Sequence, residues 1–517
     1  MVRHRVPFAL RWFAGAMALL LLLTSGLPAA VGGRPVAPAS PVPGTAEPAS
    51  PVAGTPAATP TDATPAAATP AMATPVSAGT PTPSGTVSAT PAARLTCTRP
   101  CFVRFAATPE LDTALGATGL RASYRTATAV WVGGTADDLG KLLATGPQPA
   151  FVRDATPSLM LYAVTLPAGD DDTAAIADFG TVLDRDGQTT IVQVPAVPAG
   201  VTALTGAGLR VEKVAPYVPA GTPLLAPASI VTLPDVATVT DAFPDLSTSE
   251  IERTIEDLAS TGVEPGQPGT RFFSLPGNAI AAEYLYLRFA AYGLTVWYED
   301  YVASNGLLSL NVVAEIPGTD SSQIYAGFAH YDTVSDDVED NDTAPGALDN
   351  GTGLAILLEN ARVLSGYRLH NPIRFVALDG EEVGLQGANA FGARHAAAGT
   401  PFAGGINIDS VGTSIGDRVL YVNASDTSAY IQDIMLEQYD ANGFQLNVQP
   451  RQNPAIVADE TPLTEAGIPT ILVATMLYGD PLINCTCDTI DGVDIDYVRA
   501  TGRLVMMTFA VLAAPAD

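Results

Sequence analysis

The sequence predicts an α/β protein whose main part is a mixed central sheet with helices on both faces. Between residues 245 and 517, short apolar runs typical of buried strands alternate with helical segments. Acidic residues and one histidine directly follow several of these runs, as expected where strands end at one edge of an α/β sheet. A smaller α/β domain over residues 95–236 is expected to precede this part, after a disordered Thr/Pro/Ala-rich stalk.

The first 30 residues have the pattern of a secretory signal peptide. Arg3, Arg5 and Arg11 precede an apolar run that is shorter than the about 20 residues of a membrane-spanning helix. Residues 31–94 repeat Thr-Pro and offer almost nothing to bury, which predicts a disordered linker. We expect a secreted or cell-envelope-associated protein with no stable membrane insertion after the signal is removed.

Charge and cysteine content agree with export. The chain has 53 acidic and 25 basic residues, a net charge of −28, which disfavours nucleic acid as a partner. The cysteines form two close pairs that would normally oxidise in an exported protein. These cysteines are Cys97, Cys101, Cys485 and Cys487. Three disulfide pairings are possible, and metal ligation by the last two is the alternative.

The small domain over residues 95–236 alternates apolar strands with short helical segments. A weak internal repeat relates residues 129–154 to residues 191–216, because both segments are predicted to form a strand, a short helix and a strand. The domain shows no cluster of titratable residues. A spacer, prodomain or interaction module is therefore favoured over a second active site.

The large domain is predicted to begin with two helices. Ser247 and Glu250 form a capping box before the first, and the second runs from about Asn278 to Gly293. Strands are then expected at residues 308–316, 323–330, 373–379, 404–409, 418–423 and 469–475. Helices are expected at residues 353–364, 386–396, 428–439 and 496–513.

Four short segments of this domain place candidate metal ligands after apolar strands. His330 and Asp332 alternate at the end of the second strand, and Asp349 lies on a glycine-rich turn that opens a helix. The adjacent acids Glu381 and Glu382 follow the next strand, and Asp409 ends another. Imidazole and carboxylate groups are common zinc ligands. Any one of these acids alone would more often be a helix cap or a structural ion pair.

Taken in order, these segments resemble a known family. The pattern HxD, GAxDNxxG, EExGLxG and NxDxxG, with Ala-Gly-Ile-Pro at 466–469 and Cys-Asp-Thr at 487–489, is similar to the zinc-dependent aminopeptidase family. That family includes secreted bacterial leucyl aminopeptidases, plasma glutamate carboxypeptidase, glutaminyl cyclase and the transferrin receptor ectodomain. The resemblance covers residues from about 246 to the C-terminus and implies a zinc exopeptidase fold that acts on peptides.

The resemblance also implies a role for each residue. His330 and Asp409 would hold one zinc ion, Glu382 would hold a second, and Asp349 would bridge both. Glu381 would be the general base that takes a proton from the attacking water. Asp332 would orient His330.

One ligand of the family pattern is replaced. The family places a histidine four residues before the final Asp-Thr, whereas this chain has Asn484 there. The other histidines are His4 in the signal, His370 in a polar turn and His395 on a helix, where a surface position is favoured over ligation. A second departure is Asp459-Glu460, where the family often has Asp-His.

These departures predict one firmly bound zinc ion and an uncertain second site. An amide is a poor zinc ligand but an acceptable one for a hard cation. An aminopeptidase is favoured, although the ligands alone do not separate it from a carboxypeptidase. Glutaminyl cyclase activity is disfavoured because it depends on the altered site. The alternative is a catalytically impaired binding module that has lost one metal site.

Two other readings are weaker. The GTSIG sequence around Ser414 matches a serine hydrolase pattern, but no histidine follows it in the chain. The acidic loop at residues 336–342 could bind calcium, yet it lacks the glycine and terminal glutamate of the helix-loop-helix pattern. A solvated loop near the active site is favoured, where it could attract the positive N-terminus of a substrate.

Overall fold

The computed structural model describes most of the chain after residue 100. The described residues are 101–154, 161–167, 176, 180–194, 209–218, 231–232, 243–263, 267–338, 341–416, 418–453, 457–475 and 480–514. The expected signal peptide and stalk lie outside these residues. Among the residues described, none of the helices is long and apolar enough to cross a membrane.

The N-terminal part of the described chain contains two four-stranded sheets with the same core order. The first has the order β2-β3-β1-β4 and the second has the order β6-β7-β5-β8. In each sheet a central strand, β1 or β5, pairs antiparallel with two others. The strand order of the two sheets agrees with the expected internal repeat, although residues 195–208 of its second copy lie outside the described residues. The elements are β1 (Cys101–Ala106), α2 (Pro109–Thr118), β2 (Tyr124–Arg125), β3 (Ala129–Gly134), α3 (Ala136–Ala144), β4 (Pro149–Asp154), β5 (Leu161–Thr165), β6 (Thr181–Asp186), β7 (Thr189–Gln193) and β8 (Arg210–Lys213).

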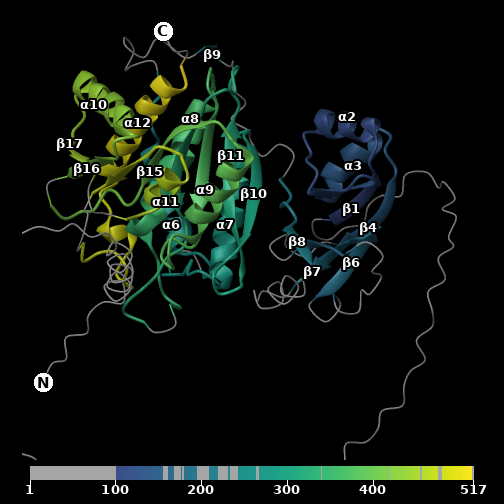
Figure 1. Ribbon diagram of the computed structural model, residues 1–517. Helices are drawn as coiled ribbons and strands as arrows, with labels where there is room; N and C mark the ends of the chain where they lie inside the picture. The colour runs from purple at the N-terminus through teal and green to yellow at the C-terminus, as the bar shows by residue number, and fades with distance from the viewer. Residues whose placement is uncertain are drawn as a thin grey trace, which may run out of the picture. The chain divides into compact units, whose positions relative to one another are not determined.

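The C-terminal part is built on an eight-stranded mixed sheet (Figure 1), which confirms the predicted fold class. Its order is β10-β11-β14-β12-β15-β18-β16-β17. The neighbours β14, β12, β15 and β18 run parallel, and the antiparallel pairs lie toward the edges. The strands are β10 (Thr295–Val302), β11 (Leu308–Ile316), β12 (Ile324–His330), β14 (Ile373–Leu378), β15 (Phe402–Ile408), β16 (Val419–Ala424), β17 (Asn447–Gln452) and β18 (Thr470–Ala474). The short strands β9 (Val231–Thr232) and β13 (Tyr367–Arg368) pair separately.

Helices cover both faces of this sheet, and the strand residues divide between two hydrophobic clusters accordingly. Alternate residues such as Phe375 and Ile406 pack against the first helix group. Phe328 and Leu378 face the other side, with Phe391 and Leu463 from the second group. The first group comprises α6 (Thr248–Ala259), α7 (Pro276–Ala291), α8 (Thr352–Leu364), α10 (Ala429–Asn442) and α12 (Ile495–Leu512), and the second comprises α9 (Gln386–Ala398) and α11 (Glu460–Glu465).

The helices and strands expected in the large domain are present, and the structure adds several elements that the apolar pattern does not predict. The longest of these are β10, the polar edge strand β17 and the six-residue helix α11. The capping box of α6 is only half formed. The Ser247 hydroxyl accepts the Glu250 N–H, but the Ser247 N–H donates to the carboxylate of Glu359 at 2.7 Å. Glu250 instead pairs with Arg288 at 2.8 Å.

The parallel strands set the position of the candidate ligands. β12, β14 and β15 are neighbours in the sheet, and their carboxyl ends therefore lie at one edge. His330 is the last residue of β12, Glu381 follows β14 and Asp409 follows β15. Asp349 lies in a short turn, η3 (Ala347–Gly351), directly before α8.

Candidate metal centre

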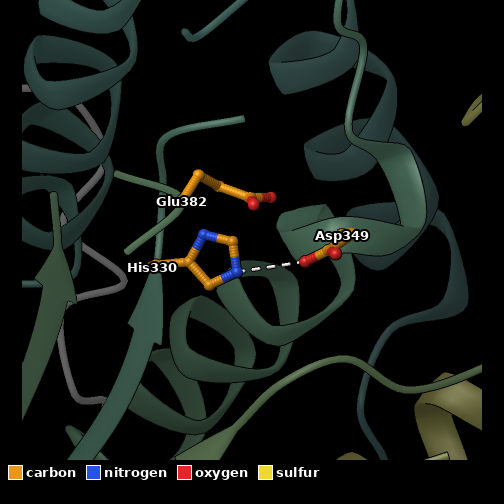
Figure 2. Close-up of side chains that lie close together, drawn as sticks. All are labelled: His330, Asp349 and Glu382. Carbon is orange, nitrogen blue, oxygen red and sulfur yellow. Dashed lines mark hydrogen bonds and ion pairs between the residues drawn. The ribbon is translucent and has the colours of Figure 1, made fainter. Parts of the chain in front are cut away.

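The structure brings the predicted ligands together around His330. Its Nε2 lies 3.0 Å from Asp349 Oδ1 and 3.3 Å from Asp409 Oδ1. Figure 2 shows the side chains of His330, Asp349 and Glu382 converging, and ligand atoms of these three residues all lie within 4.8 Å of one another. Residues separated by up to 79 positions in the sequence thus form one cluster.

This donor set fits a zinc ion. Ligand atoms about 2.0–2.1 Å from a tetrahedral zinc ion lie roughly 3.3 Å apart, close to the spacing of His330 Nε2 from the two aspartates. In addition, Glu382 Oε1 is buried without a hydrogen-bond partner. A buried oxygen in this state is expected where a cation completes the site.

The electrostatics of the cluster also favour a cation. Burial alone would lower the pKa of His330, but Asp409, Asp332 and Asp349 raise it well above its ordinary value. Burial raises the pKa of Glu381 and of Glu382, and neighbouring carboxylates raise both further. These carboxyl groups are close enough to repel one another when ionised. A divalent cation would relieve that repulsion and stabilise their ionised forms.

Asp332 positions the acid pair as well as the histidine. Its backbone carbonyl lies 3.1 Å from His330 Nδ1, whereas its carboxylate lies 3.6 Å from the same nitrogen. The two carboxylate oxygens accept the backbone N–H groups of Glu381 and Glu382 at 3.0 and 3.1 Å. The expected orientation of His330 therefore comes mainly from the carbonyl, and the carboxylate fixes the loop that carries the acids.

Asp488 holds the turn that carries Asp349 in the same way. Its carboxylate oxygens accept the backbone N–H groups of Leu348 and Asp349 at 2.6 and 3.0 Å. Burial raises the pKa of Asp488 to about 8, against the effect of these two N–H groups. The loop containing Asp488 is thereby fixed to the turn that carries Asp349.

Arg271 is a structural part of this centre that the sequence analysis missed. It is fully buried, and its guanidinium donates to the carbonyls of Tyr331 at 2.8 Å, Pro345 at 2.6 Å, Gly346 at 2.9 Å and Leu258 at 3.0 Å. These contacts join the loop of Asp332 to the segment that leads to Asp349. The guanidinium forms no direct ion pair with a described carboxylate. No local sequence signal distinguishes Arg271 from a surface arginine.

Asn484 occupies the loop that Asp488 attaches to Asp349. Its backbone has a positive φ of 53°, and its Oδ1 is buried without a hydrogen-bond partner. The next residue, Cys485, forms a disulfide with Cys487. The structure therefore contradicts the alternative hypothesis that these two cysteines bind a metal ion. Cys101 is also disulfide-bonded, and Cys97 lies outside the described residues.

The remaining candidates do not join the centre. The expected surface position of His395 is wrong. Its side chain is only 8% exposed and lies between Thr400 and Glu299, at 2.9 and 3.2 Å, because α9 packs this face against β10. His370 lies near Asp320 at 3.9 Å. Ser414 lies in an irregular segment before β16 and not before a helix, as a serine hydrolase would require.

The acidic loop contacts the Asn484 loop. The Asp336 N–H donates to the Asn484 carbonyl at 2.9 Å, and Asp337 accepts from the Thr486 N–H at 3.1 Å. Both aspartates are otherwise exposed. Residues 339 and 340 of this loop lie outside the described residues.

Comparison with known proteins gives one family and several partial relatives. Residues 311–509 match the model of peptidase family M28. A probable zinc metalloprotease of Pyrenophora tritici-repentis is 33% identical over 189 residues, covering 34% of this chain and 39% of that protein. Aminopeptidase YwaD of Bacillus subtilis is 34% identical over 157 residues, covering 30% of this chain and 31% of that protein.

Among solved structures, the LapA aminopeptidase of Legionella pneumophila is 16% identical. The match covers 70% of this chain and all of that chain, with a TM-score of 0.48. The chain spans only about a third of the length of the two sequence relatives.

Proposed function

We propose that this protein is a secreted zinc-dependent exopeptidase that removes N-terminal residues from peptides, because residues 311–509 match the model of peptidase family M28 and the partial relatives include a probable zinc metalloprotease and an aminopeptidase. The observation that carries the proposal is the placement of His330 Nε2 between Asp349 and Asp409, at 3.0 and 3.3 Å. The Glu381–Glu382 pair, fixed by Asp332, lies beside this cluster.

We assign the ligands to two unequal sites. His330, Asp409 and Asp349 would hold one zinc ion firmly, because they supply an imidazole and two carboxylates. Asp349, Glu382 and the amide oxygen of Asn484 would form a weaker site. When bound, zinc would supply a Lewis acid that polarises the scissile carbonyl and lowers the pKa of a nearby water.

Glu381 would transfer the proton in this reaction. Its carboxylate would take a proton from the attacking water as the water oxygen bonds to the scissile carbonyl carbon. It would then give that proton to the leaving nitrogen as the C–N bond breaks. The hydrogen bond from the Glu381 backbone N–H to the Asp332 carboxylate holds Glu381 beside Glu382 in a defined orientation.

An aminopeptidase is supported over other exopeptidases by charge. In addition to the ligands, the site region contains the acids Asp459 and Glu460, whose pKa values are raised by burial and further by the carboxylate of Asp409. The free N-terminus of a peptide is cationic, whereas a C-terminal carboxylate would be repelled by these groups.

We also propose that the protein is exported. Residues 1–30 would act as the signal peptide, residues 31–94 as the linker, residues 95–236 as a separate small domain and residues 245–517 as the peptidase domain. The apolar run after three arginines and the Thr-Pro repetition support this organisation.

Hydrolysis of leucine p-nitroanilide by the purified protein tests the proposed activity. We expect hydrolysis that a chelator abolishes and added zinc restores. Acetylation of the substrate amine should remove most of the activity, because an aminopeptidase requires the free amine. Zinc binding with no hydrolysis of any free or blocked substrate would instead identify a binding module that has lost its chemistry.

A further inference from the structure

The disulfide between Cys485 and Cys487 lies in the loop that carries Asn484 and Asp488. Only one residue, Thr486, separates the two cysteines, so the bond closes a very short loop. A disulfide stabilises a fold mainly by restricting the unfolded chain, and this effect decreases as the closed loop becomes shorter. The bond therefore contributes little to global stability and acts mainly on the local conformation of its loop.

The two cysteines of this disulfide differ in exposure. Cys485 is only 8% exposed, whereas Cys487 is an exposed residue. A thiolate breaks a disulfide by attacking one of its sulfur atoms, and exposed disulfides are reduced more readily than buried ones. Cys487 is therefore the residue at which an external thiol can attack.

One side of the disulfide loop is attached to the turn that carries Asp349. Asp488 directly follows Cys487 in the chain. Its carboxylate accepts the N–H groups of Leu348 and Asp349 at 2.6 and 3.0 Å. The Asp488 carbonyl also accepts the Ala347 N–H at 3.1 Å. Three hydrogen bonds to one residue thus hold the segment that supplies a candidate zinc ligand.

The other side of the disulfide loop is attached to the acidic loop. The Asn484 carbonyl accepts the Asp336 N–H at 2.9 Å. Thr486 donates its N–H and its hydroxyl to the Asp337 carboxylate at 3.1 and 3.2 Å. The disulfide lies between these contacts and those of Asp488, and it restricts the backbone that connects them. Without the bond this backbone would regain conformational freedom, which makes the contacts of Asp488 less favourable.

We propose that the Cys485–Cys487 disulfide is a thiol-exchange site whose reduction loosens Asp488 and thereby weakens zinc binding at Asp349. This inference rests on the zinc centre of the proposed function and concerns the regulation of that centre. Outer groups that hold a metal ligand in place typically change metal affinity by about 10–100-fold when they are removed. Reduction leaves Asp488 present but less firmly held, so we expect the lower end of this range.

The exchange requires two equivalents of an external thiol. Each thiol loses its proton to solvent and reacts as the thiolate. The first thiolate attacks the Cys487 sulfur, the S–S bond breaks and Cys485 leaves as a thiolate. The second attacks the mixed disulfide and releases Cys487 as a thiolate. Overall, two external thiols are oxidised to one disulfide, and the protein disulfide is reduced to two thiol groups.

The zinc affinity of the oxidised and reduced protein tests the inference without any hydrolysis. Reduction uses tris(2-carboxyethyl)phosphine, because added thiols would themselves bind zinc. Competition with a chelating dye should show that the Kd for zinc rises about tenfold on reduction. Reoxidation should restore the original Kd. The circular dichroism spectrum should not change, and unfolding of the reduced protein would overturn the inference, since the bond would then stabilise the whole fold.

A double variant separates the loss of the bond from the appearance of two thiols. Cys485→Ser/Cys487→Ser has neither, so it should bind zinc about tenfold more weakly than the oxidised wild type and should not respond to the phosphine. It retains the disulfide of Cys101. A response of this variant to the phosphine would assign the effect to that other bond and overturn the inference. If the variant does not fold, the reduced wild-type protein carries the test.

Mass spectrometry identifies the sulfur that is attacked. Brief treatment with glutathione, followed by alkylation, should place glutathione on Cys487 and the alkyl group on Cys485. The opposite pattern, or an intact disulfide, would overturn the assignment of the exchange site to Cys487.

The outcomes also separate this inference from the proposed function. An active peptidase whose zinc affinity and kcat are unchanged by complete reduction would overturn the inference and leave the peptidase assignment intact. A protein that binds zinc more weakly on reduction, yet hydrolyses no peptide in either state, would support the inference and overturn the proposed function.

Discussion

Replacing Arg271 by methionine should destabilise the protein and weaken its metal centre together. The guanidinium joins two segments that carry the candidate site, at Tyr331 and at Pro345–Gly346. Methionine keeps much of the side-chain volume and removes every donor. The carbonyls of Leu258 and Gly346 retain other donors, the N–H groups of Thr261 and Gly351. Among the described residues, the carbonyls of Tyr331 and Pro345 have no other donor.

The expected loss in the free energy of unfolding can be worked out from the carbonyls of Tyr331 and Pro345. A buried carbonyl left unpaired costs about 1–3 kcal/mol, so the loss is about 2–6 kcal/mol before compensation. Burial of the guanidinium is itself unfavourable and lowers the pKa of Arg271 to about 10, despite the surrounding carboxylates. Methionine avoids that cost. We therefore expect the free energy of unfolding to fall by about 3 kcal/mol.

Urea unfolding of the zinc-loaded protein, followed by circular dichroism, measures this loss. Chelator competition on the native variant should also show weaker zinc binding, because Asp332 and Asp349 are no longer held together. Arg271→Lys keeps the charge and should lose an intermediate amount. Arg253→Met, a surface control on α6, should stay within about 0.5 kcal/mol of wild type. Wild-type stability and zinc affinity in the Arg271→Met protein would show that the contacts of Arg271 stabilise neither the fold nor the metal centre.

The remaining predictions concern the ligands and the export signal. Asp332→Asn should lower turnover more than it lowers zinc content, because an amide cannot accept both N–H groups of Glu381 and Glu382 equally well; an unchanged turnover would remove Asp332 from the site. Asn484→His should raise the zinc stoichiometry toward two, as measured by metal analysis. Two zinc ions bound with equal affinity in the wild-type protein would show that Asn484 does not weaken the second site. N-terminal sequencing of exported protein should begin near Val31, and an intact Met1 species anchored in a membrane would contradict the soluble form.

The sequence predicts much of the sheet and the principal ligands for a physical reason. Parallel strands buried on both sides are continuous apolar runs, so segments such as 324–330 and 373–378 are visible without tertiary information. Residues that directly follow neighbouring parallel strands lie at the same edge of the sheet. His330, Glu382 and Asp409 could therefore be grouped before any distance was known.

Features that depend on distant contacts could not be predicted in this way. Arg271 binds carbonyls 60–75 positions away, and nothing in its neighbours reveals its burial. The sequence predicts a surface position for His395 because its partner, Glu299, lies 96 positions away on β10. The helix α11 has only six residues, which is too short for a clear periodic pattern.

Turnover of the Glu381→Gln variant at equal zinc content decides whether Glu381 is the general base. The substitution keeps the shape of the side chain and the hydrogen bond from the backbone N–H of residue 381 to Asp332. It removes the carboxylate that accepts the proton. We expect wild-type zinc content and a loss of about a hundredfold or more in kcat for leucine p-nitroanilide, the scale of a positioned proton-transfer group. Unchanged kcat at unchanged zinc content would contradict this role.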